Sequence, residues 1–367
     1  MIKTRYLLSG VALATSVALT GTLAFEANAA SFYEGKTLNI LTGSRAGGGA
    51  DTTLRVMSKY LTKYIPGHPK IVVKNLPGAG GQKPWNLLYE KSKNDGLTII
   101  FSAWNPVGRV TKSKGLRADY TKMPFIGGAN FTRMSYVSTE GRGVKTREAL
   151  MQAKNIKLGG NRPTSILDLS IRLSLDLLGV PYRYVPGLNP PKAYRALRGG
   201  EVDLTTVGIN FYRNRVEKSM VKTGKVIPLF YYPAVTADGK LKSSPHIKDM
   251  PSIYDFYKKV KGGKEPAGPA WEALKWINVV TGNMIYTSFG APGTSAAKIA
   301  DLRTGFNKMK ADPEYLKESL KIIGAPIDFV SVAEGEAIVN SVDGIKPEIV
   351  TYLKKFLKGG KKRKKKK

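Results

Sequence analysis

Two glycine-containing stretches give the clearest indication of the fold. They are Lys36-Thr-Leu-Asn-Ile-Leu-Thr-Gly-Ser-Arg-Ala-Gly-Gly-Gly-Ala-Asp51 and Ile71-Val-Val-Lys-Asn-Leu-Pro-Gly-Ala-Gly-Gly81. In both stretches a short apolar run predicts a strand that leads into a glycine loop and then into a helical pattern. Glycine lets backbone approach a ligand closely, and the unpaired amides at a helix N-terminus favour an anion. Two such loops at the same end of neighbouring strands predict one half of an anion-binding cradle.

The same loops have a simpler interpretation, which is that they are tight strand-to-helix turns with Asp51 as a helix cap. A nucleotide site is not indicated. No Lys-Ser/Thr pair follows the first loop, as a phosphate-binding P-loop requires, and Gly47-Gly48-Gly49 does not match the GxGxxG pattern.

Length and composition narrow the class of protein. The chain has 367 residues, which suggests about two domains, and it has no cysteine, so neither disulfides nor thiolate chemistry is available. Its two histidines, His68 and His246, are far apart and both lie in polar, turn-like stretches. A zinc site or a Ser-His-Asp triad would have to use one of them. The net charge of +32 attracts anions without choosing among small carboxylates, nucleic acid and anionic lipid.

The first 30 residues are typical of a secretory signal peptide. Lys3 and Arg5 precede an apolar run from Tyr6 to Phe25, and small residues at 27–30 offer a cleavage site. Cleavage after Ala29 or Ala30 would remove two basic residues and one acidic residue, so the mature charge is about +31. No later apolar run is long enough to span a bilayer. We therefore expect an exported, soluble protein, which argues against a role with nucleic acid.

Alternating strands and helices continue after Gly81 and predict an α/β fold with a largely parallel sheet. The strand at 97–101 ends in Ser102-Ala-Trp-Asn-Pro106, at the edge where ligands of open α/β sheets lie. Trp104 could form the floor of a pocket there, or pack against its own helix.

The alternation restarts after a crossing segment at Ser135–Ser138. Gly159-Gly-Asn-Arg-Pro-Thr-Ser165 joins a predicted strand to an apolar helix at 166–178, which Thr164 or Ser165 can cap. Their hydroxyls could also donate to a ligand. Gly187 and Thr206 follow or end two further predicted strands of this half.

These motifs resemble those of the periplasmic solute-binding proteins of tripartite tricarboxylate transporters, the Bug receptors. The resemblance covers nearly the whole mature chain to about Leu357, and its most specific part is the run from Ile65-Pro-Gly-His-Pro69 through Asn75 to Gly81. Three further features carry it: Phe32-Tyr-Glu-Gly-Lys-Thr-Leu38, Ala46-Gly-Gly-Gly-Ala-Asp51 with Arg55, and the turns at 159–165, Gly187 and Gly200–Asp203.

The resemblance implies a type II-like periplasmic binding protein fold, in which two α/β lobes close on a ligand. We expect lobe one at 31–133 and 290–358 and lobe two at 134–289, with crossings near 133–138 and 286–291 and a disordered basic tail at 359–367. That tail could touch an anionic membrane, or be a plain solvated or artificial extension. The implied partners are a small organic carboxylate and the membrane subunits of a tripartite transporter, with the receptor a periplasmic monomer.

The resemblance also implies which residues hold one ligand carboxylate, through backbone amides and small hydroxyls. The expected lobe-one contacts are Ser44, Arg45, Ala46, Gly47, Gly48, Gly49, Gly78, Ala79, Gly80, Gly81, Ser102, Ala103 and Trp104. The expected lobe-two contacts are Asn161, Arg162, Thr164, Ser165, Gly187 and Thr206. Asp51 is expected mainly as a helix cap, with contact to a ligand ammonium as the alternative.

Two departures from the family pattern introduce arginines. Ser44-Arg45-Ala46 stands where the family often has an apolar or aromatic residue and a proline, and Asn161-Arg162-Pro163-Thr164-Ser165 replaces a Gly-x-Gly-Ser loop. Arginine binds carboxylate bidentately, so we hypothesise a ligand with more than one anionic group. The alternative is that both arginines face solvent or pair with acidic neighbours.

The leading interpretation is therefore a non-enzymatic receptor that needs no metal or cofactor and transfers a small organic anion to a transporter. An exported hydrolase would need a base beside a nucleophile, which the two histidines do not offer. A polyanion- or membrane-surface-binding basic protein is the alternative, and it would show steep salt dependence.

Overall fold

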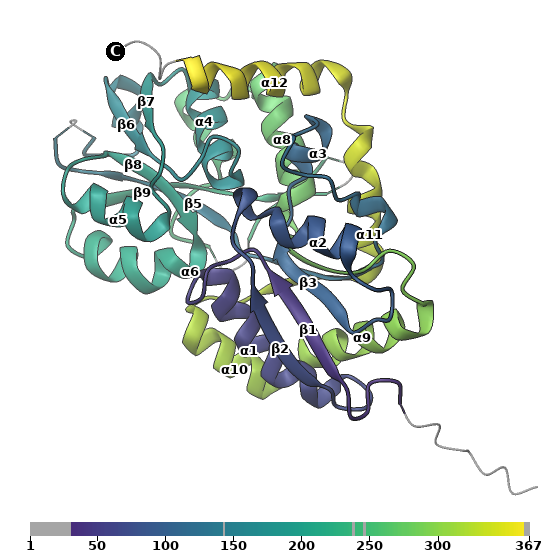
Figure 1. The fold of residues 1–367 in the computed structure, drawn as a ribbon. Coiled ribbons are helices and arrows are strands. Elements are labelled where there is room, and N and C mark those ends of the chain that lie inside the picture. The colour runs from purple at the N-terminus through teal and green to yellow at the C-terminus, as the bar shows by residue number, and fades with distance from the viewer. Residues whose placement is uncertain (1–30, 142–143, 237–238, 245–246, 363–367) are drawn as a thin grey trace, which may run out of the picture.

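The computed structural model describes residues 31–141, 144–236, 239–244 and 247–362, which form two lobes built on two separate sheets (Figure 1). The signal peptide expected at 1–30 and His246 lie outside the described residues. Among those described, no helix is both long and apolar enough to cross a membrane.

Lobe one is built on a six-stranded sheet in the order β13-β4-β12-β3-β1-β2. Its strands are β1 (Thr37–Thr42), β2 (Lys70–Asn75), β3 (Thr98–Ala103), β4 (Phe125–Asn130), β12 (Tyr286–Gly290) and β13 (Asp328–Val330). Its helices are α1 (Gly49–Tyr64), η1 (Ala79–Gly81), α2 (Lys83–Lys91), α3 (Pro106–Val110), η2 (Tyr120–Lys122), α9 (Ala296–Met309), α10 (Pro313–Ile323), α11 (Val332–Ser341) and η5 (Val342–Gly344). Apolar residues fill both faces of this sheet.

Lobe two is built on a five-stranded sheet in the order β7-β6-β8-β5-β9. Its strands are β5 (Arg133–Ser138), β6 (Ile156–Gly159), β7 (Tyr182–Val185), β8 (Leu204–Gly208) and β9 (Val226–Tyr232), beside a small hairpin of β10 (Ala234–Val235) and β11 (Leu241–Lys242). Its helices are η3 (Glu148–Gln152), α4 (Ile166–Leu178), α5 (Pro190–Arg198), α6 (Ile209–Phe211), the π-helix η4 (Tyr212–Val221), α7 (Ile253–Val260), α8 (Pro269–Gly282) and α12 (Pro347–Lys362).

The sheets are mixed rather than largely parallel, which corrects the sequence expectation. Parallel pairing is confined to β2-β1-β3 and to β7-β6-β8, where each strand is followed by a crossover helix. The strands that the chain uses to cross between lobes enter antiparallel: β5 beside β8 and β9, and β12 beside β3 and β4. The parallel strands carry the predicted glycine loops, so the error leaves the position of those loops unchanged.

The chain crosses between the lobes between β4 and β5 and again between α8 and β12. Because β12 pairs with β3 and β4, the second boundary falls before Tyr286 rather than after Phe289.

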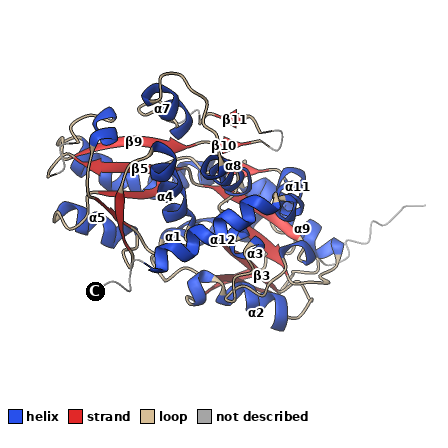
Figure 2. Ribbon diagram, turned by 90° about the horizontal axis from the view of Figure 1, so that it is seen from above, coloured by secondary structure: helices blue, strands red, loops and turns tan. Residues whose placement is uncertain are grey.

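A third crossing leads to α12, which was expected in lobe one but packs on lobe two. Ile349 and Leu353 are buried among side chains of α4 and α8, and the helix lies across those elements in both views (Figures 1 and 2). The helix also reaches Lys362, four residues into the segment expected to be disordered. An amphipathic pattern shows that a helix buries one face but does not show against which core.

Candidate functional site

The loops that follow the parallel strands of lobe one meet at one edge of the sheet. β1 and β2 are in register from Thr37 opposite Lys70 to Thr42 opposite Asn75, so the two strands end level with each other. The Gly43 amide donates to Oγ of Ser102 at 3.1 Å, which ties the first loop to the end of β3. A Cβ on Gly43 would lie 2.8 Å from the carbonyl oxygen of Gly81, so only glycine allows the first and second loops to approach this closely.

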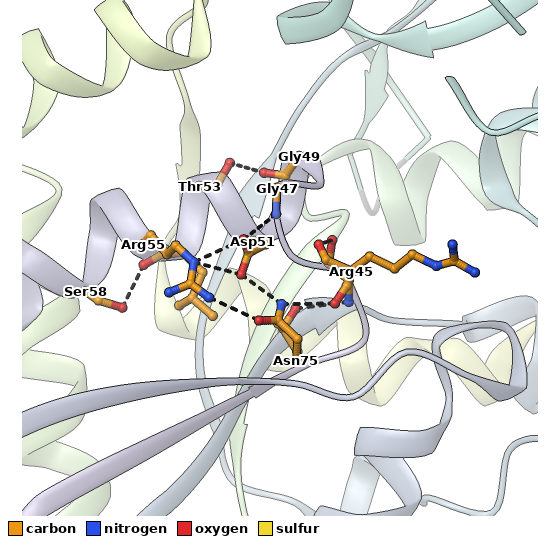
Figure 3. Close-up of polar contacts among 11 residues, drawn as sticks. Arg45, Gly47, Gly49, Asp51, Thr53, Arg55, Ser58 and Asn75 are labelled. Atoms are coloured by element: carbon orange, nitrogen blue, oxygen red, sulfur yellow. Dashed lines mark hydrogen bonds and ion pairs between the residues drawn. The ribbon is translucent and has the colours of Figure 1, made fainter. Parts of the chain in front are cut away.

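Asp51 holds the first loop in shape through hydrogen bonds from its side-chain carboxylate (Figure 3). We call a carboxylate in this role a brace. Its carboxylate accepts hydrogen bonds from the Gly47 amide at 2.8 Å, from Nδ2 of Asn75 at 2.8 Å, and from Nε of Arg55 at 3.1 Å to both oxygens. The same Asn75 amide donates to the carbonyl of Ser44 at 3.0 Å. Asp51 is only 1% exposed and is fully engaged, so it shapes the loop rather than binding a ligand.

The details of this helix start differ from the expectation. The helix begins at Gly49 with Gly48 as its N-cap, and Asp51 is the third helical residue, from which it reaches back to the Gly47 amide. Burial alone would raise the pKa of Asp51, but the hydrogen bonds from Arg55, Asn75 and Gly47 outweigh burial and hold that pKa below its ordinary value. Asp51 therefore carries a fixed negative charge, which Arg55 compensates.

The second loop presents backbone at the edge of the sheet. Gly78, Ala79, Gly80 and Gly81 all have positive φ, at 140°, 45°, 67° and 87°. Ala79 is the one residue of the four that is not glycine, and the left-handed conformation is strained for it. Gly78, Ala79 and Gly80 are exposed, and their own side chains are no larger than a methyl group, so much of the backbone is accessible there.

Lobe two has a matching loop between β6 and α4, braced by Asp168. This carboxylate accepts hydrogen bonds from the Arg162 amide at 2.6 Å and from the hydroxyl of Tyr184 at 2.9 Å. Ser165 is the N-cap of α4 and accepts from the Asp168 amide at 3.3 Å, as its capping interpretation predicted. Burial raises the pKa of Asp168 to about 6, and the hydrogen bonds only partly offset that effect.

Two side chains of lobe two reach the glycine loops of lobe one. A Cβ on Gly80 would lie 3.4 Å from Nε of Arg162, and a Cβ on Gly49 would lie 3.5 Å from Nδ2 of Asn210. The lobes therefore approach each other at the predicted loops. Farther from these loops, Nδ2 of Asn214 also joins the lobes, through a hydrogen bond of 2.7 Å to the Ile323 carbonyl.

Arg162 is the more informative of the two. Within the described residues its guanidinium forms neither an ion pair nor a hydrogen bond, and burial lowers its pKa. Arg45 behaves differently: it is exposed, and Figure 3 shows its side chain extending away from the Asp51 cluster. The structure thus separates the two arginines that the sequence had treated alike.

Several predicted contacts are used inside the lobes instead. Trp104 is 3% exposed, and its Nε1 donates to the Met284 carbonyl at 3.0 Å, so it packs in the core of lobe one. The hydroxyl of Thr206 is buried beside Oγ of Ser135 at 2.6 Å, and Ser102 accepts from Gly43. The predicted residues left exposed at the loop edges are Arg45, Ala46, Gly47, Gly49, Gly78, Ala79, Gly80, Ala103, Asn161, Thr164 and Gly187.

Asn210 is a site residue that the sequence reasoning missed. It follows β8 directly, at the carboxyl end of a buried parallel strand, which is where ligand contacts gather. That position was the available signal. It was overlooked because the helical stretch from Ile209 to Val221 was not recognised.

No group of three or more His, Asp or Glu side chains among the described residues could hold a metal ion. His68 is an exposed turn residue whose Nδ1 lies 3.2 Å from the Thr62 carbonyl. A surface hollow of about 390 Å³ beside Lys122, Glu336 and Asn340 lies on lobe one, and no glycine-loop residue lines it.

Comparison with known proteins bears on the fold. No family model matches the sequence, and no curated protein is similar to it at the level of sequence. The periplasmic binding protein BugD superposes with a TM-score of 0.60 at 18% identity, over 88% of this chain and 98% of its own. MatC from Rhodopseudomonas palustris, with bound malate, gives 0.58 at 15% identity, over 88% and 99%. A second R. palustris protein, with adipate, gives 0.61 at 17% identity, over 87% and 97%. The chain therefore has the two-lobed fold of the periplasmic solute-binding proteins.

Proposed function

We propose that the protein is an exported receptor that captures a small organic carboxylate between its lobes and delivers it to a tripartite tricarboxylate-type membrane transporter. The observation that carries the proposal is the approach of Arg162 to the exposed backbone of the second glycine loop. Among the described residues the guanidinium of Arg162 forms neither an ion pair nor a hydrogen bond, although the charge of Asp168 acts on it. The similar structures with malate and with adipate support a carboxylate as the ligand class.

Glycine-loop backbone and an arginine suit the two ends of a dicarboxylate. Loop amides and the N-terminus of α1 favour one carboxylate, in a region where closure of the lobes excludes water and strengthens the interaction. Arg162 can hold a second carboxylate bidentately. Asn210, which reaches the start of α1 from lobe two, can donate its amide hydrogens to the same ligand. We therefore assign a small dicarboxylate as the ligand, with binding and release but no chemical conversion.

The signal-peptide pattern at 1–30 and the fold support export to the periplasm. A receptor of this design meets its ligand outside the cytoplasmic membrane and shuttles it to membrane subunits. We propose that the receptor works as a monomer, since both halves of the site come from one chain.

Native mass spectrometry of the mature protein, followed by the same measurement after denaturation, tests the receptor function. We expect release of a small organic acid from the purified protein, or a rise in the unfolding temperature when organic acids are added. If no acid co-purifies and none in a broad panel of mono-, di- and tricarboxylates shifts the unfolding temperature, the receptor proposal fails.

Calorimetric titration with succinate and butyrate tests the role of Arg162, because the two acids have the same chain length and differ by one carboxylate. We expect Arg162→Gln to weaken succinate binding at least tenfold, as loss of a charged hydrogen-bonded partner does, and to change butyrate binding far less. Arg45→Gln is the matched control, since it removes the same charge from an exposed loop position. An unchanged succinate-to-butyrate ratio in Arg162→Gln would refute the dicarboxylate assignment and leave the receptor function standing.

A further inference from the structure

Seven cations cover one outer face of lobe two, over the neighbouring helices α5 and η4. Tyr194 of α5 joins this pair of helices through a hydrogen bond of 2.8 Å to Oγ of Ser219 and an edge contact with the ring of Phe211 at 5.9 Å. Figure 1 shows α5 on the side of lobe two that is far from β3. We call the following exposed residues the basic face: Lys192, Arg195, Arg198, Arg215, Lys218, Lys222 and Lys225.

The helices divide cleanly between a buried side and a charged side. In α5 the buried residues are Ala193, Ala196 and Leu197, and the cations occupy the positions between and after them. In η4 Val216 and Met220 are buried while the cations beside them are exposed. The basic face is therefore fixed to the core of lobe two rather than carried on a loose segment.

The cations of the basic face have no acidic partners among the described residues. None of the seven forms an ion pair within the described ranges. On lobe one, by contrast, Lys59 of α1 pairs with Glu318 of α10 at 2.7 Å, and Lys63 pairs with Asp312 at 3.3 Å. Arg213 of η4 itself turns away from the basic face and pairs with Glu217 and Asp249.

The chemistry of the basic face favours a lipid surface over a protein partner. Stable protein interfaces rest on buried aromatic and apolar anchors. The exposed large apolar side chains among the described residues lie on other helices: Leu87 on α2, and Leu316, Leu320 and Ile322 on α10. A rigid array of cations without apolar anchors matches the phosphate headgroups of an anionic bilayer, which it would hold electrostatically and reversibly.

We propose that the basic face adsorbs to anionic phospholipid. α5 begins just after the loop that contains Gly187, and η4 begins just after Asn210, so both helices that carry the basic face start close in sequence to the proposed ligand site. Adsorption through it would hold that site close to the membrane in which a transporter resides. This use of the excess charge is separate from ligand binding and does not depend on which acid the cleft takes.

Vesicle sedimentation with the mature, full-length protein tests this proposal. The vesicles are phosphatidylcholine alone, or phosphatidylcholine with about one third phosphatidylglycerol, at about 0.15 M salt, where weaker surface attractions are screened. The test variant carries Lys192→Gln, Arg195→Gln, Lys218→Gln and Lys222→Gln. The matched control carries Lys93→Gln, Lys308→Gln, Lys317→Gln and Lys321→Gln, four exposed lysines of lobe one. Both keep the C-terminal lysines, so the tail contributes equally.

We expect the wild type and the control variant to bind the anionic vesicles and not the neutral ones. Each basic residue near an anionic surface strengthens adsorption about fivefold, so the test variant should bind at least tenfold more weakly. Equal loss in the two variants would mean that total charge or the tail, and not the basic face, drives adsorption. That result, or a wild type that does not distinguish the two kinds of vesicle, would overturn the proposal. Unchanged unfolding temperatures show that both variants are folded.

Discussion

Each lobe holds a glycine-containing loop in place with a buried aspartate, but the pKa values of the two aspartates are shifted in opposite directions. Asp51 and Asp168 each occupy the third position of a helix, and each carboxylate accepts hydrogen bonds from the loop just before it. Asp51 has Arg55 one turn along its own helix, and its pKa is lowered. Asp168 has no ion pair within the described residues, and burial raises its pKa to about 6.

The two aspartates differ in how they engage the arginine nearest to them. In lobe one Arg55 neutralises the carboxylate of Asp51, and Arg45 is exposed and extends away from that cluster. The second glycine loop offers only backbone to a ligand. In lobe two an amide and a tyrosine hydroxyl donate to the carboxylate of Asp168. The guanidinium of Arg162 acts on that carboxylate through its charge alone and forms neither an ion pair nor a hydrogen bond among the described residues. A dicarboxylate that binds between the lobes would meet neutral donors on one side and a cation on the other.

The largest difference between the two loops should appear in the free energy of unfolding when Asp51 or Asp168 is replaced by asparagine. Asp51→Asn removes the charge that Arg55, Asn75 and the Gly47 amide share, and we expect a loss of about 3 kcal/mol in the free energy of unfolding at pH 7. Asp168→Asn replaces a carboxylate that is costly to ionise, and its effect should stay within about 1 kcal/mol. Urea unfolding of both variants gives the values; equal losses would contradict the contrast.

The pH dependence of stability should differ in sign between the two carboxyl groups. The folded pKa of Asp168 is about 6, above its unfolded value, so its stabilising contribution is complete below the unfolded pKa and is lost as pH rises through about 6. Between pH 4.5 and pH 7 the wild type should therefore lose about 2 kcal/mol relative to Asp168→Asn.

Asp51 contributes in the opposite direction, because its folded pKa is lowered. Its contribution is present above the unfolded pKa and is lost only as pH falls through the folded value, which lies below that window. Urea unfolding at several pH values measures the difference between the two proteins. If the difference in the free energy of unfolding between the wild type and Asp168→Asn did not change with pH, ionisation of Asp168 would not destabilise the folded protein.

Replacing Arg55, the exposed partner of Asp51, should change the free energy of unfolding least. Arg55 has a side chain that is 53% exposed, so its ion pair is screened by solvent. We expect Arg55→Gln to lower the free energy of unfolding by about 0.5 kcal/mol and to move the pKa of Asp51 upward. Carboxyl-resonance NMR titration follows that pKa, and a loss as large as that of Asp51→Asn would mean that the arginine, not the loop amides, holds the loop.

Much of the arrangement of the two glycine loops could be predicted from glycine and helix patterns alone. Short-range rules place strand, glycine loop and helix in order, and the register of β1 and β2 then brings the two loops together. These rules do not show which way a side chain turns, so Arg45 and Arg162 looked equivalent. For the same reason Thr206 looked available although Ser135, far away in sequence, engages its hydroxyl.

One helical stretch and the packing of one helix escaped prediction for a different reason. The stretch from Ile209 to Val221 is polar, begins without a clear cap and continues as a π-helix, whose spacing does not match the 3.6-residue period used to recognise helices. Helix α12 was predicted, but its return to lobe two depends on Ile349 and Leu353 finding the core around α4 and α8. Both elements rest on contacts between distant parts of the chain.

A crystal structure of the mature protein with succinate tests the central claim most directly. The account predicts one succinate between the lobes, with one carboxylate against the backbone at 47–49 and 78–81 and the other on the guanidinium of Arg162. Succinate bound outside this cleft, or in it with Arg162 turned into solvent, would contradict the account.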